Sequence, residues 1–162
     1  MRRLFLLLVL FLFSLIGLFY TLINDEVSLT GSSIVSLETG FVGKVIDGDT
    51  VVINGESIRL LGIDTDERGY PCFNEAKKRI EELVLNKEVT MEKDVQDKDQ
   101  YKRLLRYIFV ENEGREINVN LQMAREGLAI ARFYEDRKYK EEILAAEKEA
   151  RLAKRGCKWE GV

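Results

Sequence analysis

The feature that most constrains this chain is a strand-rich stretch, "VIDGDTVVINGESIRLLGIDTDE", which occupies residues 45–67. Within it, Asn54–Gly55 separates two runs of β-branched and aliphatic residues, 50–53 and 57–63. Asn-Gly between two such runs is the strongest short-range signal for a two-residue hairpin turn. The sequence therefore predicts an antiparallel meander, in which "FVGKVI" at 41–46 supplies the preceding strand.

The segment after the meander has helical periodicity. In "NEAKKRIEELVLN", residues 74–86, apolar side chains recur at i, i+4, i+7 and i+8 from Ala76, which places them on one face of a helix. Asn74 is the expected N-cap. Two further strands are expected at 88–93 ("EVTMEK") and 103–110 ("RLLRYIFV"), because both runs are rich in residues that favour strands.

The last third of the chain is expected to contain a helix, a strand and a second helix. Asn118 is expected to cap a short helix that ends at Gly127, and "LAIARF" at 128–133 is interpreted as a final strand. A charged helix with one apolar stripe is expected at 138–154. Short strands interrupted by helices favour an α+β fold with a mainly β core. We expect a five-stranded OB-type Greek-key barrel with three helices.

The first residues have a different composition. After Arg2 and Arg3, residues 4–23 form a run of 20 residues without a charge, which is long enough for a helix to span a bilayer. A cleaved signal sequence would usually have a shorter apolar region and a small-residue cleavage site, and the run contains no A-x-A motif. We therefore expect an N-terminal transmembrane helix before the barrel, with a cleaved signal sequence as the alternative.

These patterns divide the chain into an anchor or signal sequence (1–23), a linker (24–39) and one folded domain (40–160). Two arginines precede the apolar run, whereas Asp25 and Glu26 follow it, and this asymmetry favours a cytoplasmic N-terminus. The domain is therefore expected outside the cytoplasm. It would be anchored to the membrane, or secreted if the N-terminal segment is cleaved.

The exported part contains both cysteines of the chain, Cys72 and Cys157. An even number of cysteines in an oxidising compartment is compatible with a disulfide. We expect a Cys72–Cys157 bridge, and two buried thiols are the alternative.

Charge and composition exclude several classes of function. Without Arg2 and Arg3, the chain has 23 Lys and Arg against 28 Asp and Glu, so the part after the apolar run has a net charge near −5. A general nucleic-acid coat protein would be basic, so any polyanion must be bound by a local cationic site or a metal. The chain has no histidine, which excludes histidine-based hydrolase chemistry and histidine zinc sites.

Acidic residues lie at the ends of the predicted strands. Asp49 precedes the strand at 50–53, and Asp64 and Thr65 follow the strand at 57–63. Singly, such residues are more often turns than sites. Together, two carboxylates and the Thr65 carbonyl match the oxygen ligands that a hard cation such as Ca2+ prefers. Arg59 adds a planar, permanently charged fork that suits phosphate.

Three motifs in this order resemble the staphylococcal nuclease-like (thermonuclease) family: Asp-Gly-Asp-Thr at 47–50, Arg-x4-Asp-Thr-x-Glu at 59–67, and Asp-x-Tyr-x-Arg at 99–103. With a terminal helix that closes on a Gly and a Trp, the resemblance covers about residues 41–159. It implies an OB barrel and calcium-dependent cleavage of single-stranded or frayed DNA and RNA, giving 3′-phosphate ends. It implies no protein partner and a monomeric soluble domain.

The resemblance also assigns roles to individual residues. Asp49 and Asp64 match the family's calcium-binding carboxylates, and Thr65 matches its carbonyl ligand. The family's catalytic trio corresponds to Arg59, Glu67 and Arg103. In that assignment the arginines hold the scissile phosphate, and Glu67 orients or deprotonates the attacking water.

The sequence departs from the family pattern at two places near these residues. Asp66 stands where proline is usual and brings an extra carboxylate. Lys102 replaces a glycine, so a residue tolerant of positive φ is lost, although a lysine there can contact phosphate. The family's base-stacking tyrosine falls at or near Phe133, with Tyr134 and Tyr101 as further candidates. Packing in the core is the alternative for all three aromatic residues.

Two other functions are compatible with parts of the sequence. One is an OB domain that binds nucleic acid without cutting it, against which the intact catalytic trio argues. The other is an anchored calcium-binding adhesion module. That function explains the acidic residues but leaves Arg59 and Arg103 without a role.

Overall fold

The structure is a computed structural model that describes residues 37–161. The predicted transmembrane segment, residues 4–23, and nearly all of the predicted linker lie outside the described residues. Within the described range, no helix combines the length and apolar character needed to cross a membrane.

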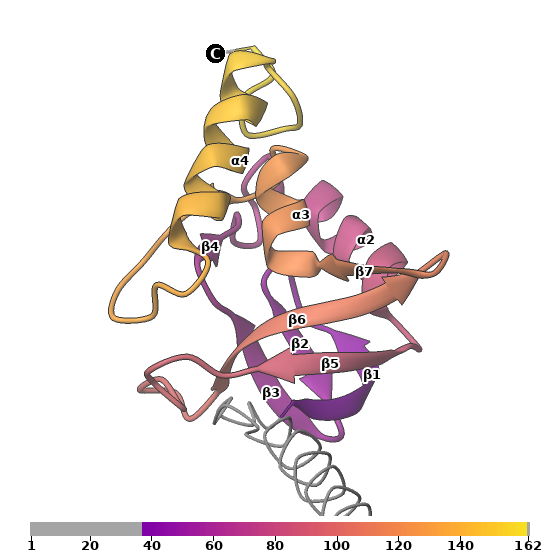
Figure 1. Ribbon diagram of the computed structural model, residues 1–162. Helices are drawn as coiled ribbons and strands as arrows, with labels where there is room; N and C mark the ends of the chain where they lie inside the picture. Colours follow the sequence, from indigo (N-terminus) through magenta and orange to yellow (C-terminus); the bar gives the residue numbers. More distant parts are fainter. Residues whose placement is uncertain (1–36, 162) are drawn as a thin grey trace, which may run out of the picture. The chain divides into compact units, whose positions relative to one another are not determined.

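The core of the domain is a five-stranded mixed β-barrel, as expected from the sequence (Figure 1). Its strands are β1 (Glu38–Val45), β2 (Thr50–Ile53), β3 (Glu56–Leu60), β5 (Glu88–Glu92) and β6 (Leu104–Asn112). The circuit runs β1-β2-β3-β6-β5 and returns to β1, and only the β3–β6 pairing is parallel. That pairing closes the barrel and places Arg59 opposite Leu105.

The hairpin predicted at Asn54–Gly55 is confirmed. Both residues have positive φ, 51° and 87°, as a two-residue hairpin of the favoured type requires, and Ile53 pairs with Glu56 across it. β1 pairs with two strands. Its first half pairs with β5, and its second half pairs with β2. The register of the β1–β2 pairing shifts between Val42 and Lys44, and such bulges bend a strand.

Three helices cover one end of the barrel: α2 (Phe73–Val84), α3 (Val119–Arg125) and α4 (Lys140–Leu152) (Figure 1). The apolar face predicted for α2 is buried. Its predicted N-cap is wrong, because the helix begins two residues earlier and its N-cap is Cys72, not Asn74. No side chain caps this end, but the Cys72 N–H donates to the Asp66 carboxylate from the preceding loop at 2.9 Å.

The predicted cap of α3 is confirmed, since the Asn118 side chain accepts a bond from Leu121 N. Two short elements differ from expectation. A strand that was not predicted, β7 (Arg115–Asn118), pairs with β6, and the predicted strand 128–133 contracts to β8 (Ile130–Ala131). β8 pairs with the equally short β4 (Ile63–Asp64), which limits the number of residues that can pair. This small ladder fixes the backbone that carries Asp64.

Candidate active site

A pocket of about 560 Å³ lies where the ends of β2, β3 and β4 meet the loop before β6. Seven of the predicted site residues line it: Asp49, Arg59, Asp64, Glu67, Tyr101, Arg103 and Tyr134. A larger hollow of about 760 Å³ beside α2 contains none of them. Convergence of charged groups, more than volume, therefore identifies the candidate site.

Asp49 is a buried acid of this pocket, and only 7% of the residue is exposed. It lies in the turn before β2, where Asp47 Oδ1 accepts a bond from its backbone N–H. Its Oδ2 accepts bonds from Thr65 N at 2.9 Å and Thr65 Oγ1 at 3.1 Å. Burial raises the pKa of Asp49 above its ordinary value, against the opposing effect of nearby Arg59. The ionised carboxylate therefore gains from a nearby cation.

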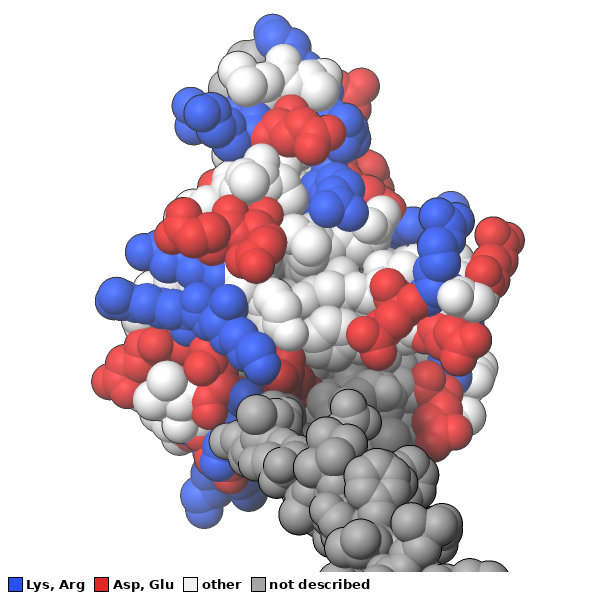
Figure 2. Space-filling model, in the orientation of Figure 1, with Lys and Arg blue, Asp and Glu red and all other residues white. Residues whose placement is uncertain are grey.

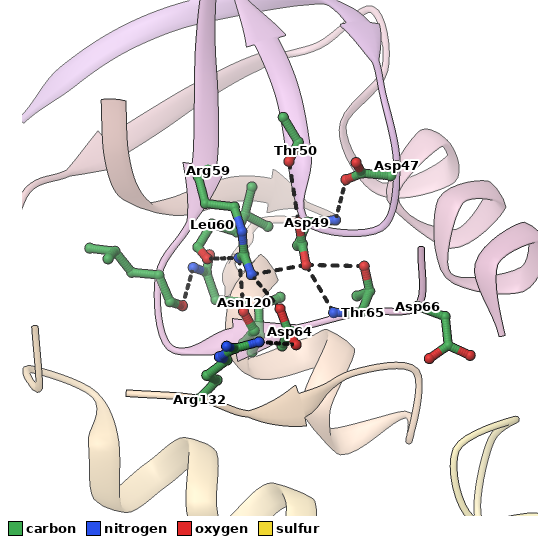
Figure 3. Close-up of polar contacts among 12 residues, drawn as sticks. Asp47, Asp49, Thr50, Arg59, Leu60, Asp64, Thr65, Asp66, Asn120 and Arg132 are labelled. Atoms are coloured by element: carbon green, nitrogen blue, oxygen red, sulfur yellow. Dashed lines mark hydrogen bonds and ion pairs between the residues drawn. The ribbon is translucent and has the colours of Figure 1, made fainter. Parts of the chain in front are cut away.

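Arg59 lies between the two predicted calcium carboxylates (Figure 3). Its Nη2 is 2.8 Å from Asp64 Oδ1 and 3.1 Å from Asp49 Oδ2, and its Nη1 donates to the Ile63 carbonyl at 2.8 Å. One cationic nitrogen thus contacts an oxygen of each carboxylate. The three residues that sequence reasoning selected from two different motifs meet at one point.

The same geometry tests whether the residues suit a metal. The carboxylates of Asp49 and Asp64 converge where a positive charge is stabilised, and they offer only oxygen, which suits a hard cation such as Ca2+. Among residues 37–161, no group of three or more acidic or cysteine side chains gathers closely enough to hold a metal by itself. The two carboxylates fit calcium, provided that carbonyl oxygens and water complete the coordination shell.

Two residues after Thr65, Glu67 lines the pocket from an exposed loop. Asp66, between them, points away from Asp49 and Asp64 (Figure 3). It pairs with Lys158 instead, and it accepts the bond from Cys72 N. Burial alone would raise the pKa of Asp66, but these partners outweigh it and hold the pKa below its ordinary value. The extra carboxylate is therefore not part of the acidic pair that faces Arg59.

Arg103 reaches the pocket from the loop before β6, and Asp99 holds it there. Asp99 Oδ2 accepts from Arg103 Nε at 2.7 Å, and Oδ1 accepts from the backbone N–H groups of Tyr101 and Arg103. Lys102 adopts φ +64°, so the turn keeps its left-handed conformation although glycine is absent. That conformation costs a lysine about 1–2 kcal/mol.

The aromatic candidates separate into two groups. Tyr101 and Tyr134 line the pocket with 71% and 66% of their surface exposed, so their rings are available to a ligand. Phe133 packs against the core and closely approaches Gly62, and it does not line the pocket. Lys102 is exposed but is also absent from the lining. Stacking on Phe133 therefore has no geometric support in this structure.

Two residues of the site have no signal in the sequence motifs. Arg132 donates to Asp64 Oδ2 at 2.8 Å and to the Tyr134 hydroxyl at 2.8 Å, so Asp64 contacts two arginines. Asn120 on α3 is fully buried, donates to the Leu61 carbonyl at 2.8 Å and so braces the turn after Arg59. Both contacts join segments more than fifty residues apart, which spacing within a motif cannot indicate.

The predicted disulfide between Cys72 and Cys157 is present, and the two Cα atoms are 5.3 Å apart. It joins the start of α2 to the segment after α4.

Over the visible face of the domain, basic and acidic side chains are interspersed without forming one broad basic surface (Figure 2). The cations that could meet a polyanion in the pocket are therefore local: Arg59, Lys98, Arg103 and Arg132 line it.

Comparisons with known proteins show the family to which this chain is similar. Residues 57–160 match the family described as staphylococcal nuclease homologue. The thermonuclease of Staphylococcus hyicus is 35% identical over 136 residues, covering 77% of this chain and 78% of the relative. The thermonuclease of Staphylococcus intermedius is also 35% identical, over 153 residues and 85% and 86% of the two chains. A protein of Methanocaldococcus jannaschii is 34% identical over 140 residues, covering 69% and 67%.

Proposed function

This chain belongs to the staphylococcal nuclease family, and on that premise we propose that it is a calcium-dependent phosphodiesterase that cleaves DNA and RNA outside the cytoplasm. The observation that carries the proposal is the convergence of Asp49, Arg59 and Asp64, with Glu67 and Arg103 lining the same pocket. We assign the barrel to the OB type, because its five strands close as a single circuit of that kind.

In this proposal Asp49 and Asp64 hold Ca2+, and the Thr65 carbonyl contributes a further oxygen ligand. The bound ion would supply electrostatic stabilisation for charge that builds up on the phosphate. If both carboxylates held calcium, Arg59 would lose its two carboxylate partners but keep its bonds to the Leu60 and Ile63 carbonyls, and its Nη2 could bind another anion. The scissile phosphate is that anion.

Arg59 and Arg103 approach the pocket from β3 and from the loop before β6, so their guanidinium groups can contact one phosphate group. Two such forks would stabilise the charge that develops as a fifth oxygen joins phosphorus. Glu67 would orient or deprotonate the attacking water from its exposed loop. Departure of the 5′ oxygen then leaves a 3′-phosphate, the product type that the family resemblance implies.

Single-stranded or frayed nucleic acid fits the pocket best as substrate. Tyr101 and Tyr134 offer exposed aromatic faces at its rim, and unpaired bases can stack on such rings. The alternative of a silent nucleic-acid-binding OB domain is less favoured, because all three members of the catalytic trio face one pocket.

An extracytoplasmic location is supported by the disulfide, which such compartments allow. The proposal includes the anchor at residues 4–23.

The proposal is tested by incubating the full-length protein with single-stranded DNA in Ca2+ or in chelator and analysing the ends. We expect cleavage only with calcium, 3′-phosphate products, and loss of cleavage in Asp49→Ala. Glu111→Ala, at an exposed acidic residue of β6, is the matched control and should cleave normally. Full activity in chelator would refute the metal assignment. Binding without cleavage by the wild type would favour the silent domain.

A further inference from the structure

The loop that carries Thr65 and Glu67 is attached to the end of the chain by a closed ring of contacts. Asp66 pairs with Lys158, whose neighbour Cys157 is bonded to Cys72. The Cys72 N–H returns to the Asp66 carboxylate at 2.9 Å. The ring therefore consists of one ion pair, one disulfide and one hydrogen bond, and it joins residues up to 92 positions apart.

The far side of this ring is itself firmly held. Lys158 N donates to the Gly127 carbonyl at 3.0 Å, so backbone and side chain of Lys158 are both engaged. Gly127 approaches Arg155 so closely that an added Cβ would lie 1.8 Å from the Arg155 carbonyl oxygen. The side chains of Lys158 and Asp66 are only 16% and 19% exposed, so their pairing is partly shielded from water. The C-terminal segment is thus a fixed support for the loop.

On its other side the ring borders the proposed active site. Asp66 lies between Thr65, which donates twice to Asp49, and Glu67, which lines the pocket. Glu67 is exposed, and its backbone carbonyl accepts a bond from Tyr70 within the same loop. Thr65 is therefore fixed from the pocket side, whereas the position of Glu67 depends on how the ring holds Asp66.

We propose that Lys158 and Asp66, held together with the help of the Cys72–Cys157 disulfide, are positioning residues that keep Glu67 in place for catalysis. This inference rests on the proposed function of the pocket. Neither residue contacts substrate. They act by restricting the loop, and a displacement of about 1 Å in a reacting group can reduce a rate by about 100-fold.

The test compares full-length variants in cleavage rate and in amide hydrogen exchange at residues 65–67. For Lys158→Met we expect cleavage to fall about 10- to 100-fold and exchange at 65–67 to accelerate at least tenfold in calcium-free buffer. Lys158→Arg should restore both, because it keeps the charge. Cys157→Ser, which removes the disulfide, should likewise slow cleavage and accelerate exchange at residues 65–67. The single tryptophan, Trp159, reports by its fluorescence whether the C-terminal segment stays packed.

The matched control is Arg79→Met, which removes another long-range and partly shielded ion pair, that of Arg79 with Glu126, whose side chains are 32% and 24% exposed. Unchanged rate and exchange in both Lys158→Met and Cys157→Ser would overturn the inference, as would an equal loss in the Arg79 control. If Lys158→Met does not fold, Asp66→Asn, which keeps the acceptor for Cys72 N–H, replaces it. If the wild type does not cleave, the proposed function fails, while the exchange measurement still tests the ring.

Discussion

Two loops bring catalytic candidates into the same pocket, and they are held in opposite ways. The Arg103 loop, residues 99–103, is organised around Asp99, whose carboxylate bonds to residues two and four positions later. The Glu67 loop, residues 65–72, is held by Lys158 and Cys157 from the far end of the chain. A catalytic residue can thus be positioned by its sequence neighbours or by a distant segment, and only the first arrangement is visible within a short motif.

The largest effect is expected from a variant that tests whether Glu67 takes part in catalysis. In Glu67→Gln the amide keeps the size of the side chain but cannot accept the proton of water. We expect turnover to fall by roughly 10²- to 10⁴-fold with nearly unchanged affinity for an uncleavable oligonucleotide. Rates and affinities measured on the same preparation separate the two effects.

Glu75→Gln is the matched control for this prediction, because Glu75 is an exposed glutamate in the first turn of α2. It should retain the normal rate. A normal rate in Glu67→Gln would instead make Glu67 a solvated loop residue. Parallel losses of affinity and rate would assign it to the metal shell or to the structure of the loop.

A smaller effect is expected from breaking the Arg103 loop at Asp99. Asp99→Asn turns an NH2 group or a neutral oxygen toward Arg103, so the charge-assisted bonds to the guanidinium are weakened. We expect about 2 kcal/mol lower stability, measured by denaturant unfolding, and about a tenfold lower cleavage rate. Hydrogen exchange at residues 65–67 should stay normal, because the two loops are held independently. Faster exchange there would contradict the contrast between them.

The pKa of Asp99 makes the stability of the protein depend on pH. Burial alone would raise the pKa of Asp99, but its bonds with Arg103 prevail and hold the pKa below its ordinary value. A depressed carboxyl pKa means that the stabilisation is present above the unfolded value, about 3.9, and is lost as pH falls through the folded pKa. The stability difference between wild type and Asp99→Asn should therefore be constant near neutral pH and shrink below about pH 4.

The smallest effect concerns the strained turn of the Arg103 loop. Lys102 has φ +64°, and glycine would remove the steric cost while increasing the entropy of the unfolded chain. We expect Lys102→Gly to raise stability by roughly 0.5–1 kcal/mol, with little change in cleavage rate. Thermal unfolding measures the first quantity. A strong loss of activity would show that the lysine charge itself contacts the substrate.

The contrast between the loops also explains which parts of the structure were predictable. The barrel strands, the Asn54–Gly55 hairpin and the apolar face of α2 follow from patterns among chain neighbours, and the structure contains them. The start of α2 at Cys72 was not predictable, because the Cys72 N–H bonds to Asp66 in the preceding loop and no capping side chain marks the position. The final strand, β8, is shorter than the predicted strand at 128–133, because it pairs only with the two residues of β4.

For the site, the resemblance of three local motifs to the thermonuclease family selected Asp49, Arg59, Asp64, Glu67 and Arg103 as candidates. The tertiary structure decided the rest. It brought Arg132 onto Asp64 across 68 positions. It also turned Asp66 toward Lys158 across 92 positions, away from the acidic pair. Such contacts depend on which elements fold against one another, and a linear pattern contains no measure of that proximity.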